Sequence, residues 1–441
     1  MSVLGNTIPT WETAAYLRTL PAIRERCGRV HELAKKGGLQ YFEYHPEKEV
    51  DVAKFCIDLM KRDYGEDFTS IKPHGRWRHL DTSILRVEPL LSKWSSHPTN
   101  APDVKEQARR TVDLFLVSVL LDAGAGSTWK YTEKSTGLTF SRSEGLGVAS
   151  VHMFESGLFS SDPDQPYRVD AAALEKVTAE KVASAMQVSE SNPMVGIEGR
   201  ASLLSNLSKA LKTSPQFFGV DGRPGNVIDF LETQGKPDSS NSKFTIPIAA
   251  LWSALIDGLN PIWPSRISLG RVSLGDVWPC PALKAQAGST FQEGDDLVPF
   301  HKLTQWLTYS LIEVLERNLG WKLEGVEDMT GLPEYRNGGL LVDLGVLTLK
   351  LNHDLPKDPK SGLPRVRPSH PAIVEWRAMT VIELDRIADL IRTQLNLSPS
   401  QLTLAQVLEG ATWKGGREIA KLKRPETGGP PIEIESDGTI F

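Results

Sequence analysis

The chain has 441 residues, enough for one large domain or up to about three ordinary ones. Apolar residues make up 40% of it and charged residues 24%, which excludes a disordered chain and predicts a folded, soluble protein with a sizeable core. The net charge of −5 provides no broad positive field, which argues against a nucleic-acid polymer as partner.

Helices dominate the predicted structure of the first third of the chain. Helical segments are expected where apolar residues recur at the spacing of one helix face, at 10–36, 50–60, 82–91 and 103–122. The intervening segment 73–81 is rich in Pro, Gly and charge, which predicts an exposed basic loop. After Asp122 a Gly-rich turn ends the helical pattern, and Trp129 and Tyr131 follow.

The remainder of the chain mixes helices with irregular segments. Helical spacing is present at 170–188, 198–211, 300–319 and 371–395. Short strands or coil are expected at 137–147 and 264–296, and the tail after Lys421 should be peripheral. The alternating β and α segments of a parallel sheet are missing. We therefore predict a mainly α, multi-helix fold with irregular or short-β insertions.

The sequence offers no clear linker between domains. Each Pro/Gly-rich stretch is short enough to be a loop inside one domain. We therefore expect one large helical unit over 1–441, with possible sub-regions at 1–131, 212–298 and 299–441. The last of these carries most of the candidate site.

Nothing in the sequence indicates export or a membrane span. Residues 1–6 lack a basic stretch followed by an apolar one, and the longest apolar run, 114–121, is far shorter than the roughly 20 residues that cross a bilayer. Cys27, Cys56 and Cys280 are odd in number and widely separated. We expect a cytoplasmic protein with buried thiols.

The turn at 122–126 is the first candidate for chemistry. Its glycines could suggest a dinucleotide site, but the third glycine is missing and the preceding segment has helical character, so helix termination explains them better. Asp122, with Trp129 and Tyr131 shortly after it, could also shape the floor of a pocket.

A second candidate is the basic segment around Trp77. Arg76, Arg78 and His79 surround this indole, an arrangement that suits a phosphate or a flat ligand. A solvated basic surface with one packed Trp explains the same residues and is favoured on sequence alone. His74 and His79 are five apart with no Cys or carboxylate to complete a set, so we expect neither a metal nor another cofactor.

The most informative segments are the start of the helix near 300 and the loop around Glu334. Lys302 and Gln305 share one face of a helix that should otherwise be buried, so these polar groups need partners. Glu334 and Arg336 could supply them, although a purely structural salt-bridge cluster explains the residues equally well. The candidate polar residues of this region are Lys302, Gln305, Glu334, Tyr335, Arg336, Glu375 and Arg377.

Four blocks spread over the chain carry a family resemblance. They are Leu-Leu-Asp-Ala-Gly-Ala-Gly at 120–126 with Trp129 and Tyr131, Arg-Ser-Glu-Gly-Leu at 142–146, Gly-Arg-Pro-Gly-Asn-Val at 222–227, and Gly-Leu-Pro-Glu-Tyr-Arg-Asn-Gly-Gly at 331–339. The chain resembles the uracil-catabolism protein four family. That family is cytoplasmic and belongs to a pyrimidine-degradation pathway that opens the ring of a uracil nucleotide and ends in urea.

A more distant resemblance concerns the chemistry. Blocks at 76–79, 300–305, 334–336 and 375–378 occur in the same order as similar blocks in the queuosine salvage nucleosidases. This resemblance implies an all-α fold similar to the helix-hairpin-helix DNA glycosylases and cleavage of an N-glycosidic bond in a ribonucleotide. The catalytic lysine and aspartate of that family correspond to Lys302 and Glu334, with Glu in place of Asp. The segment 212–298 has no clear counterpart.

The resemblance and the residue chemistry together imply roles for the candidate residues. Cleavage of a ribosyl–nitrogen bond builds positive charge on the sugar, so Glu334 would stabilise the transition state and orient a water, while Lys302 would keep Glu334 charged. Arg336 could pair with a phosphate or with Glu334. The further expected binding residues are Arg76 and Arg78 for a 5′-phosphate, Asp122, Trp129 and Tyr131 for the leaving group, and His79, Gln305, Tyr335, Glu375 and Arg377.

We therefore predict an N-glycosidic bond hydrolase of uracil catabolism that releases urea from ribosylurea or its 5′-phosphate. The expected partner is this small ribosyl substrate, and no metal or cofactor is implied. One alternative is a non-catalytic pathway protein that binds a uracil-derived ribosyl intermediate, since no self-evident nucleophile is present. Another is a nucleic-acid glycosylase, which the implied fold suggests and the net charge argues against.

Overall fold

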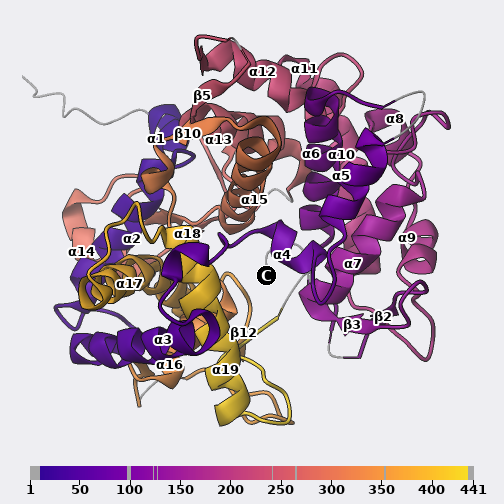
Figure 1. The fold of residues 1–441 in the computed structure, drawn as a ribbon. Coiled ribbons are helices and arrows are strands. Elements are labelled where there is room, and N and C mark those ends of the chain that lie inside the picture. Colours follow the sequence, from indigo (N-terminus) through magenta and orange to yellow (C-terminus); the bar gives the residue numbers. More distant parts are fainter. Residues whose placement is uncertain are drawn as a thin grey trace, which may run out of the picture. The chain divides into compact units, whose positions relative to one another are not determined.

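The computed structural model describes residues 10–96, 101–122, 124–126, 128–240, 242–263, 266–351 and 354–435 (Figure 1). These residues form two units, each assembled from separate segments of the chain. The first unit comprises the described residues within 10–74, 266–302 and 327–435, and the second those within 75–263 and 303–326. Whether the two units act as the one large helical unit expected from the sequence stays a prediction.

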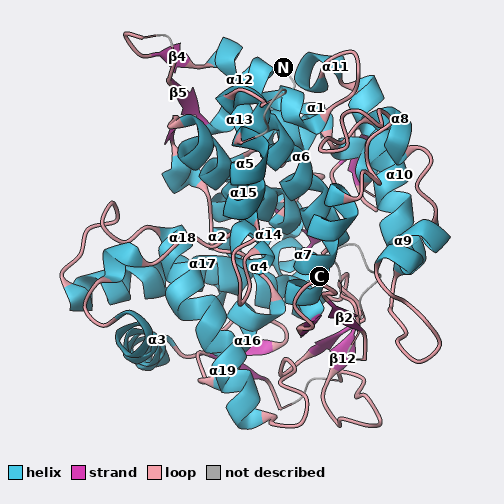
Figure 2. Cartoon of the chain, turned by 45° about the vertical axis from the view of Figure 1, so that its right-hand side comes forward, coloured by secondary structure: helices cyan, strands magenta, loops and turns pink. Residues whose placement is uncertain are grey.

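Helices make up most of both units, and the strands are short (Figure 2). The described strands pair in twos or threes and form no extended sheet. The prediction of a mainly α fold is therefore confirmed. The segment 212–298 contributes helices as well as the expected short strands.

The first unit is built around the long helix α17. This helix packs against α2 and α3, and α16 packs against α19. The buried face of α17 includes Val374, Val381, Leu384 and Ile387. The helices of this unit are α1 (Thr10–Tyr16), α2 (Leu20–Ala34), α3 (Glu49–Tyr64), α14 (Pro281–Ala287), α16 (Tyr335–Asp343), α17 (Pro371–Leu395), α18 (Leu404–Val407) and α19 (Trp413–Lys423), with a π-helical turn, η7 (Leu408–Thr412).

Short strands join distant segments of the first unit. The antiparallel pairs are β1 (Phe42–Tyr44) with β11 (Leu347–Leu349), β6 (Ser268–Leu269) with β7 (Val272–Ser273), and β8 (Val277–Pro279) with β9 (Leu297–Pro299). β12 (Arg365–Val366) and β13 (Glu433–Ile434) are parallel. Ile432 is fully buried beside β13. The other described residues after Lys421 are exposed or partly exposed, so the expectation of a peripheral tail holds apart from this one side chain.

The second unit is centred on α6, which is buried along most of its length and packs against α7 and α10. Its helices are α4 (Arg76–Leu80), α5 (Val87–Ser95), α6 (Val104–Leu121), α7 (Arg142–Glu155), α8 (Ala171–Leu174), α9 (Ala179–Ala185), α10 (Ile197–Thr213), α11 (Pro215–Phe218), α12 (Val227–Gln234), α13 (Ile248–Gly258) and α15 (Lys302–Leu319), of which only Lys302 belongs to the first unit. Its strands are β2 (Lys130–Thr132) with β3 (Thr139–Ser141), and β10 (Lys322–Glu324), β5 (Phe244–Pro247) and β4 (Lys236–Pro237) in one sheet.

The segment 73–81 differs from its prediction as an exposed basic loop. It contains α4, in which Arg76 and Trp77 are almost completely buried and His79 is 4% exposed. Its charge could be buried because partners distant in sequence neutralise it, and a local composition argument does not detect such partners.

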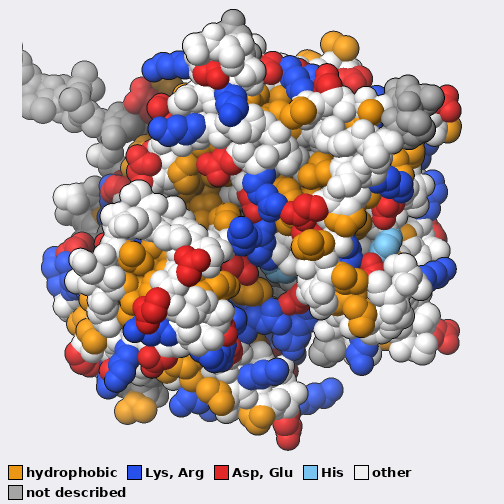
Figure 3. Space-filling view, viewed as in Figure 1, with side chains coloured by type: hydrophobic (Ala, Val, Ile, Leu, Met, Phe, Trp, Pro, Cys, Tyr) orange, Lys and Arg blue, Asp and Glu red, His pale blue; other side chains and the backbone are white. Residues whose placement is uncertain are grey.

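Charged side chains of both signs alternate with apolar ones on the face drawn in Figure 3. This mixture agrees with the small net charge of −5. Within the part of the chain that the structure describes, no helix combines the length and the apolar composition needed to cross a membrane.

Candidate active site

Glu334 lies directly before α16 and caps it. Its Oε2 accepts the N–H of Arg336 at 2.8 Å, and its Oε1 accepts the N–H of Asn337 at 2.6 Å. The first N–H groups of a helix have no partner within the helix, so a side-chain oxygen at this position satisfies them and lies near the positive end of the helix dipole. Each carboxylate oxygen has a further lone pair, and the residue is 7% exposed.

Arg336 lies among aromatic rings of the first unit. Its guanidinium is 5.0 Å from the centre of the Trp413 ring and 5.5 Å from that of Tyr335, and its Nε donates to the Tyr335 hydroxyl at 3.3 Å. Cation–π contacts of this kind orient a guanidinium. The two expected binding residues Tyr335 and Arg336 are thus in contact with each other.

Arg377, on α17, joins the segment before Glu334 to Asp276. Its Nη1 and Nη2 donate to Oδ1 and Oδ2 of Asp276 at 2.8 Å each, and its Nε donates to the carbonyl oxygen of Pro333 at 3.3 Å. Bidentate pairs between arginine and a carboxylate are strong and geometrically specific. Burial raises the pKa of Asp276, but the charge and hydrogen bonds of Arg377, with the bonds from Trp278 and the Lys302 N–H, together bring that pKa well below its ordinary value.

Asp276 also holds the residues that lead into α15. Its carbonyl oxygen accepts the N–H of Phe300 at 2.9 Å and that of His301 at 3.3 Å. Its carboxylate oxygen Oδ2 accepts the N–H of Lys302 at 3.0 Å. The backbone of Lys302 is therefore fixed at the first residue of its helix.

The two predicted catalytic residues share one support. Lys302 is bonded to Asp276, Asp276 to Arg377, and Arg377 to Pro333, the residue before Glu334. All of these residues belong to the first unit. The backbones that carry these two residues are thus tied to one ion pair, and the meeting of the carboxylate and the ammonium at one site stays a prediction.

Glu375 contacts a different segment, although it precedes Arg377 by only two residues. Its carboxylate accepts the N–H of Gln40 at 2.7 Å and that of Tyr41 at 3.0 Å. Burial raises the pKa of Glu375, and the two N–H bonds oppose this effect without cancelling it. The contacts place Glu375 as an anchor for the segment before β1, and its expected contact with a substrate stays a prediction.

In the second unit, Arg76 and Asp122 form a buried ion pair. The Nη1 of Arg76 donates to Oδ2 of Asp122 at 2.6 Å, and its Nε donates to the Ser118 hydroxyl at 2.7 Å. The guanidinium lies 5.4 Å from the Trp306 ring centre. Burial lowers the pKa of Arg76, and the charge of Asp122 opposes that shift. The structure thus brings together two residues expected at the site, and a phosphate at Arg76 would share the guanidinium with Asp122.

Other expected binding residues of the second unit are also engaged within it. Arg78 donates to Oε1 of Glu313 at 2.5 Å. His79 meets the Trp306 ring edge to face, with 5.6 Å between the ring centres. Gln305, on α15, is fully buried. His79 and Gln305 lie inside the unit, and Arg78 is partly exposed but paired, so the segment is not the solvated basic surface that the sequence also allowed.

Trp129 and Tyr131 lie at the β2–β3 hairpin. The Trp129 indole is fully buried, and its N–H donates to the carbonyl oxygen of Met186 at 2.9 Å. Tyr131 stacks on His152 of α7, with 6.1 Å between the ring centres. Burial raises the pKa of Tyr131. Trp129 thus contacts the segment at Met186 and Tyr131 contacts α7, whereas Asp122 contacts Arg76.

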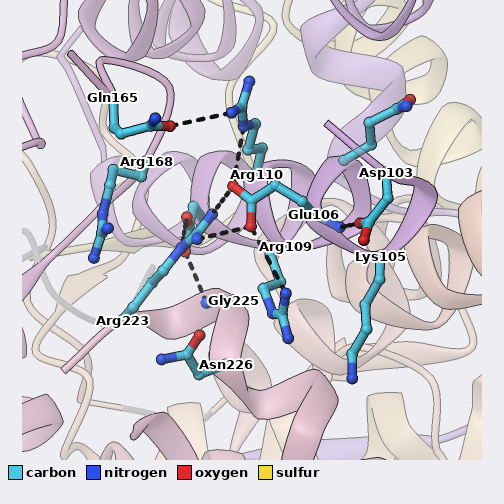
Figure 4. Close-up of polar contacts among 12 residues, drawn as sticks. Asp103, Lys105, Glu106, Arg109, Arg110, Gln165, Arg168, Arg223, Gly225 and Asn226 are labelled. Carbon is cyan, nitrogen blue, oxygen red and sulfur yellow. Dashed lines mark hydrogen bonds and ion pairs between the residues drawn. The ribbon is translucent and has the colours of Figure 1, made fainter. Parts of the chain in front are cut away.

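The block at 222–227 has a clear structural role, shown in Figure 4. Arg223 donates from Nε to Asp113 at 2.8 Å and from Nη1 and Nη2 to Glu106 at 3.0 Å each. The N–H of Gly225 donates to Asp113 at 2.7 Å, and a Cβ at this glycine would overlap the backbone of Arg109. This block fastens the start of α12 to α6, which explains its residues without a ligand.

The second unit contains a pocket of about 250 Å³ between α5, α7 and the loop after β2. Arg86 pairs there with Glu133 through two contacts of 2.8 Å and lowers the pKa of Glu133 to about 2. Lys93, His152 and Glu155 also line it. None of the predicted site residues does so.

Two further features of the described residues concern metal-ligating side chains and the three cysteines. They contain no group of three or more His, Cys, Asp or Glu side chains placed to hold a metal ion. Cys27, Cys56 and Cys280 are buried, as expected from the sequence. Burial raises the pKa of Cys56 to about 12 and that of Cys280 to about 11, so these thiols are poor nucleophiles.

Sequence reasoning missed Asp276. The only local signal is one acidic residue between Gly275 and the apolar pair Val277 and Trp278, a pattern that also fits an exposed turn. Its partner Arg377 follows 101 residues later. Only the folded chain brings the two together.

Comparison with known proteins identifies the class to which the chain belongs. A family described as "Protein of unknown function (DUF1688)" matches residues 16–441, and the chain is a member of this family.

Two relatives extend over almost the whole chain. One is "Uracil catabolism protein 4" of Lachancea kluyveri, 42% identical over 443 residues, which cover 97% of this chain and 98% of that protein. The other is "Protein urg3" of Schizosaccharomyces pombe, 42% identical over 432 residues, which cover 98% and 99%. The resemblance to the uracil-catabolism protein four family is thereby confirmed.

Proposed function

We propose that the protein hydrolyses an N-glycosidic bond in uracil catabolism and releases urea from ribosylurea or its 5′-phosphate. The near-full-length relative named for uracil catabolism supports the pathway. The observation that supports the reaction is that Lys302 and Pro333, the residue before Glu334, are both attached to the Arg377–Asp276 pair.

In the proposed step, a water adds to the anomeric carbon while the bond to the urea nitrogen breaks. One proton of the water ends on that nitrogen, so the products are urea and ribose or its 5′-phosphate. Positive charge builds up on the ribosyl ring as the bond breaks. The Glu334 carboxylate would stabilise this charge, and its lone pairs not used by α16 could orient the water. Lys302 would keep Glu334 charged and in place.

The test measures urea released over time from each of the two compounds by the purified protein. We expect release by the wild type and a loss of at least about 100-fold in Glu334→Gln, because the amide cannot stabilise a cationic transition state or accept a proton. Gln retains one oxygen to cap α16, so the variant should fold.

The matched control is Glu327→Gln, the same change at an exposed position of the first unit. It should release urea at the wild-type rate. Full activity of Glu334→Gln would remove the assigned role. Stabilisation of the wild type by the ribosyl compounds without urea release would instead support a non-catalytic binding protein.

A further inference from the structure

The turn that leads into Lys302 has an unusual backbone conformation. His301 has a φ of 45°, in the left-handed region that residues with a side chain rarely adopt. Its ring is buried, and its Nε2 donates to the carbonyl oxygen of Leu17 at 2.9 Å. Strained backbone of this kind persists only where the surroundings hold it, and it clusters at functional sites.

Asp276 provides much of that support. It bonds three consecutive residues, Phe300 and His301 through its carbonyl oxygen and Lys302 through its carboxylate. A helix cap would need only the bond to the first N–H of α15. The bidentate pair of Asp276 with Arg377 goes beyond capping, because Arg377 also bonds the backbone directly before Glu334.

We propose that Asp276 is a positioning residue, which fixes the position of the Lys302 backbone relative to Glu334. This inference rests on the proposed roles of Glu334 and Lys302. Asp276 needs no contact with the substrate, since it acts through the backbone of Lys302, and its pair with Arg377 holds its carboxylate in place for that role.

The arginine at the centre of this connection is buried, and Asp276 is partly buried. The contacts from Lys302 to Asp276 and from Asp276 to Arg377 are 2.8 to 3.0 Å long, and the contact from Arg377 to the Pro333 carbonyl is 3.3 Å. Arg377 is only 2% exposed, and its guanidinium lies 4.1 Å from the centre of the Phe300 ring. Charge-assisted bonds in such surroundings resist displacement. A misplacement of a catalytic group by about 1 Å can cost on the order of 100-fold in rate.

The first variant is Asp276→Asn. The amide has the shape of the carboxylate and keeps one acceptor oxygen, but it cannot form the charged bidentate pair with Arg377. We expect kcat for urea release to fall by about 10- to 100-fold with KM little changed, because the support acts on the catalytic groups rather than on binding.

Asp343→Asn is the matched control. Asp343 pairs bidentately with Arg424 at 2.8 and 2.5 Å in the same unit, and this pair includes neither Lys302 nor Glu334. Both variants should lower Tm, whereas only Asp276→Asn should lower kcat. An equal loss of kcat in both variants, or no loss in Asp276→Asn, would overturn the proposal.

A double-mutant cycle with Lys302→Met tests whether Asp276 acts through Lys302. If it does, Asp276→Asn should cause little further loss of kcat once Lys302 has been replaced. Losses that multiply would show that Asp276 acts independently of Lys302 and would contradict the proposal.

A measurement without turnover separates this inference from the proposed function. If the wild type releases no urea from either compound, the proposed function fails. The surroundings of Lys302 can still be measured without turnover. Acetic anhydride acetylates the lysine at several alkaline pH values, and mass spectrometry reports how much of Lys302 is labelled at each. Asp276→Asn should change the pH profile of Lys302 labelling, because the pair with Arg377 that holds the Asp276 carboxylate against the Lys302 backbone loses its charge on one side. Asp343→Asn should leave the profile unchanged. An unaltered profile in Asp276→Asn would refute the positioning role.

Discussion

Two carboxylates of the first unit, the partly buried Asp276 and the buried Glu375, differ in what balances their charge. Asp276 faces the guanidinium of Arg377, and this ion pair, together with the bonds from Trp278 and the Lys302 N–H, outweighs the effect of burial on its pKa. Glu375 accepts two backbone N–H groups, from Gln40 and Tyr41, and burial remains the larger effect on its pKa. The first arrangement stabilises the charged form, whereas the second favours a protonated carboxyl.

Glu375 should therefore make stability depend on pH. Because its folded pKa lies above the ordinary value of 4.5, its contribution to stability is fully present below pH 4.5 and is lost as the pH rises through the folded pKa. Glu375→Gln buries no charge. We expect the free energy of unfolding of this variant, relative to wild type, to rise with pH across that window by about 1.4 kcal/mol per unit of pKa shift.

Denaturant titrations at several pH values measure this difference. The exposed Glu327→Gln serves as the control, and its difference from wild type should stay constant over the same range. A difference between Glu375→Gln and wild type that does not change with pH would contradict the effect of burial on this carboxyl.

Residue chemistry predicted part of the candidate site and no more. It indicated that the polar groups near Lys302 and Glu334 needed partners, but it did not indicate Asp276, whose partner Arg377 lies far along the chain. It also did not predict that Glu334 caps a helix, because Glu is a less common cap than Ser, Thr, Asp or Asn.

At the scale of elements, helix ends with strong local signals were predicted well. Asp103 caps α6 by accepting the N–H of Glu106 at 2.7 Å, and the predicted helix starts there. α17 begins at Pro371 and ends before Asn396, which has a left-handed conformation, and its predicted bounds are confirmed. These ends are readable because they depend on neighbouring residues only.

Helix bounds were predicted poorly where a proline interrupts the apolar spacing or where a hydrogen bond outside the helix fixes its first residue. The helix expected at 10–36 is two helices, α1 and α2, because Pro21 favours a helix start and cannot continue a helix. The expected helix at 82–91 begins later, at Val87, where the Asp81 carboxylate accepts the N–H groups of Arg86 and Val87. Apolar spacing alone does not show either feature.

The close approach of α16 and α19 gives a prediction about packing. A Cβ at Gly416 would overlap the carbonyl oxygen of Arg336, which is backbone and cannot move aside easily. Gly416→Ala should therefore lower the free energy of unfolding by about 1–3 kcal/mol. Thermal or denaturant unfolding measures this loss.

The neighbouring Gly415 provides the control. A Cβ there would meet Phe55 at 3.4 Å and Leu340 and Leu59 at 3.5 Å, which are ordinary contacts. Gly415→Ala should be neutral or stabilising by up to about 1 kcal/mol, because alanine favours a helix over glycine. Equal destabilisation by both substitutions would show that the overlap at Gly416 is not the cause.

At the scale of the whole molecule, charge separates the proposed function from a nucleic-acid glycosylase. The net charge is −5, and several arginines are already paired with carboxylates, among them Arg76, Arg223 and Arg377. We expect no retention of DNA or RNA in a filter-binding titration at moderate salt, because binding of a polyanion needs free cationic groups. Retention at that salt would favour the glycosylase alternative.

The segmented build of the first unit has a consequence for folding during synthesis. β1 pairs with β11, and α2 packs against α17, so partners in this unit are separated by roughly 300 residues of chain. Most of the second unit emerges from the ribosome before these partners exist. The faces of α2 and α3 that pack against α17 therefore have no native partner until α17 is made, and we expect the nascent N-terminal segment to need chaperones until then.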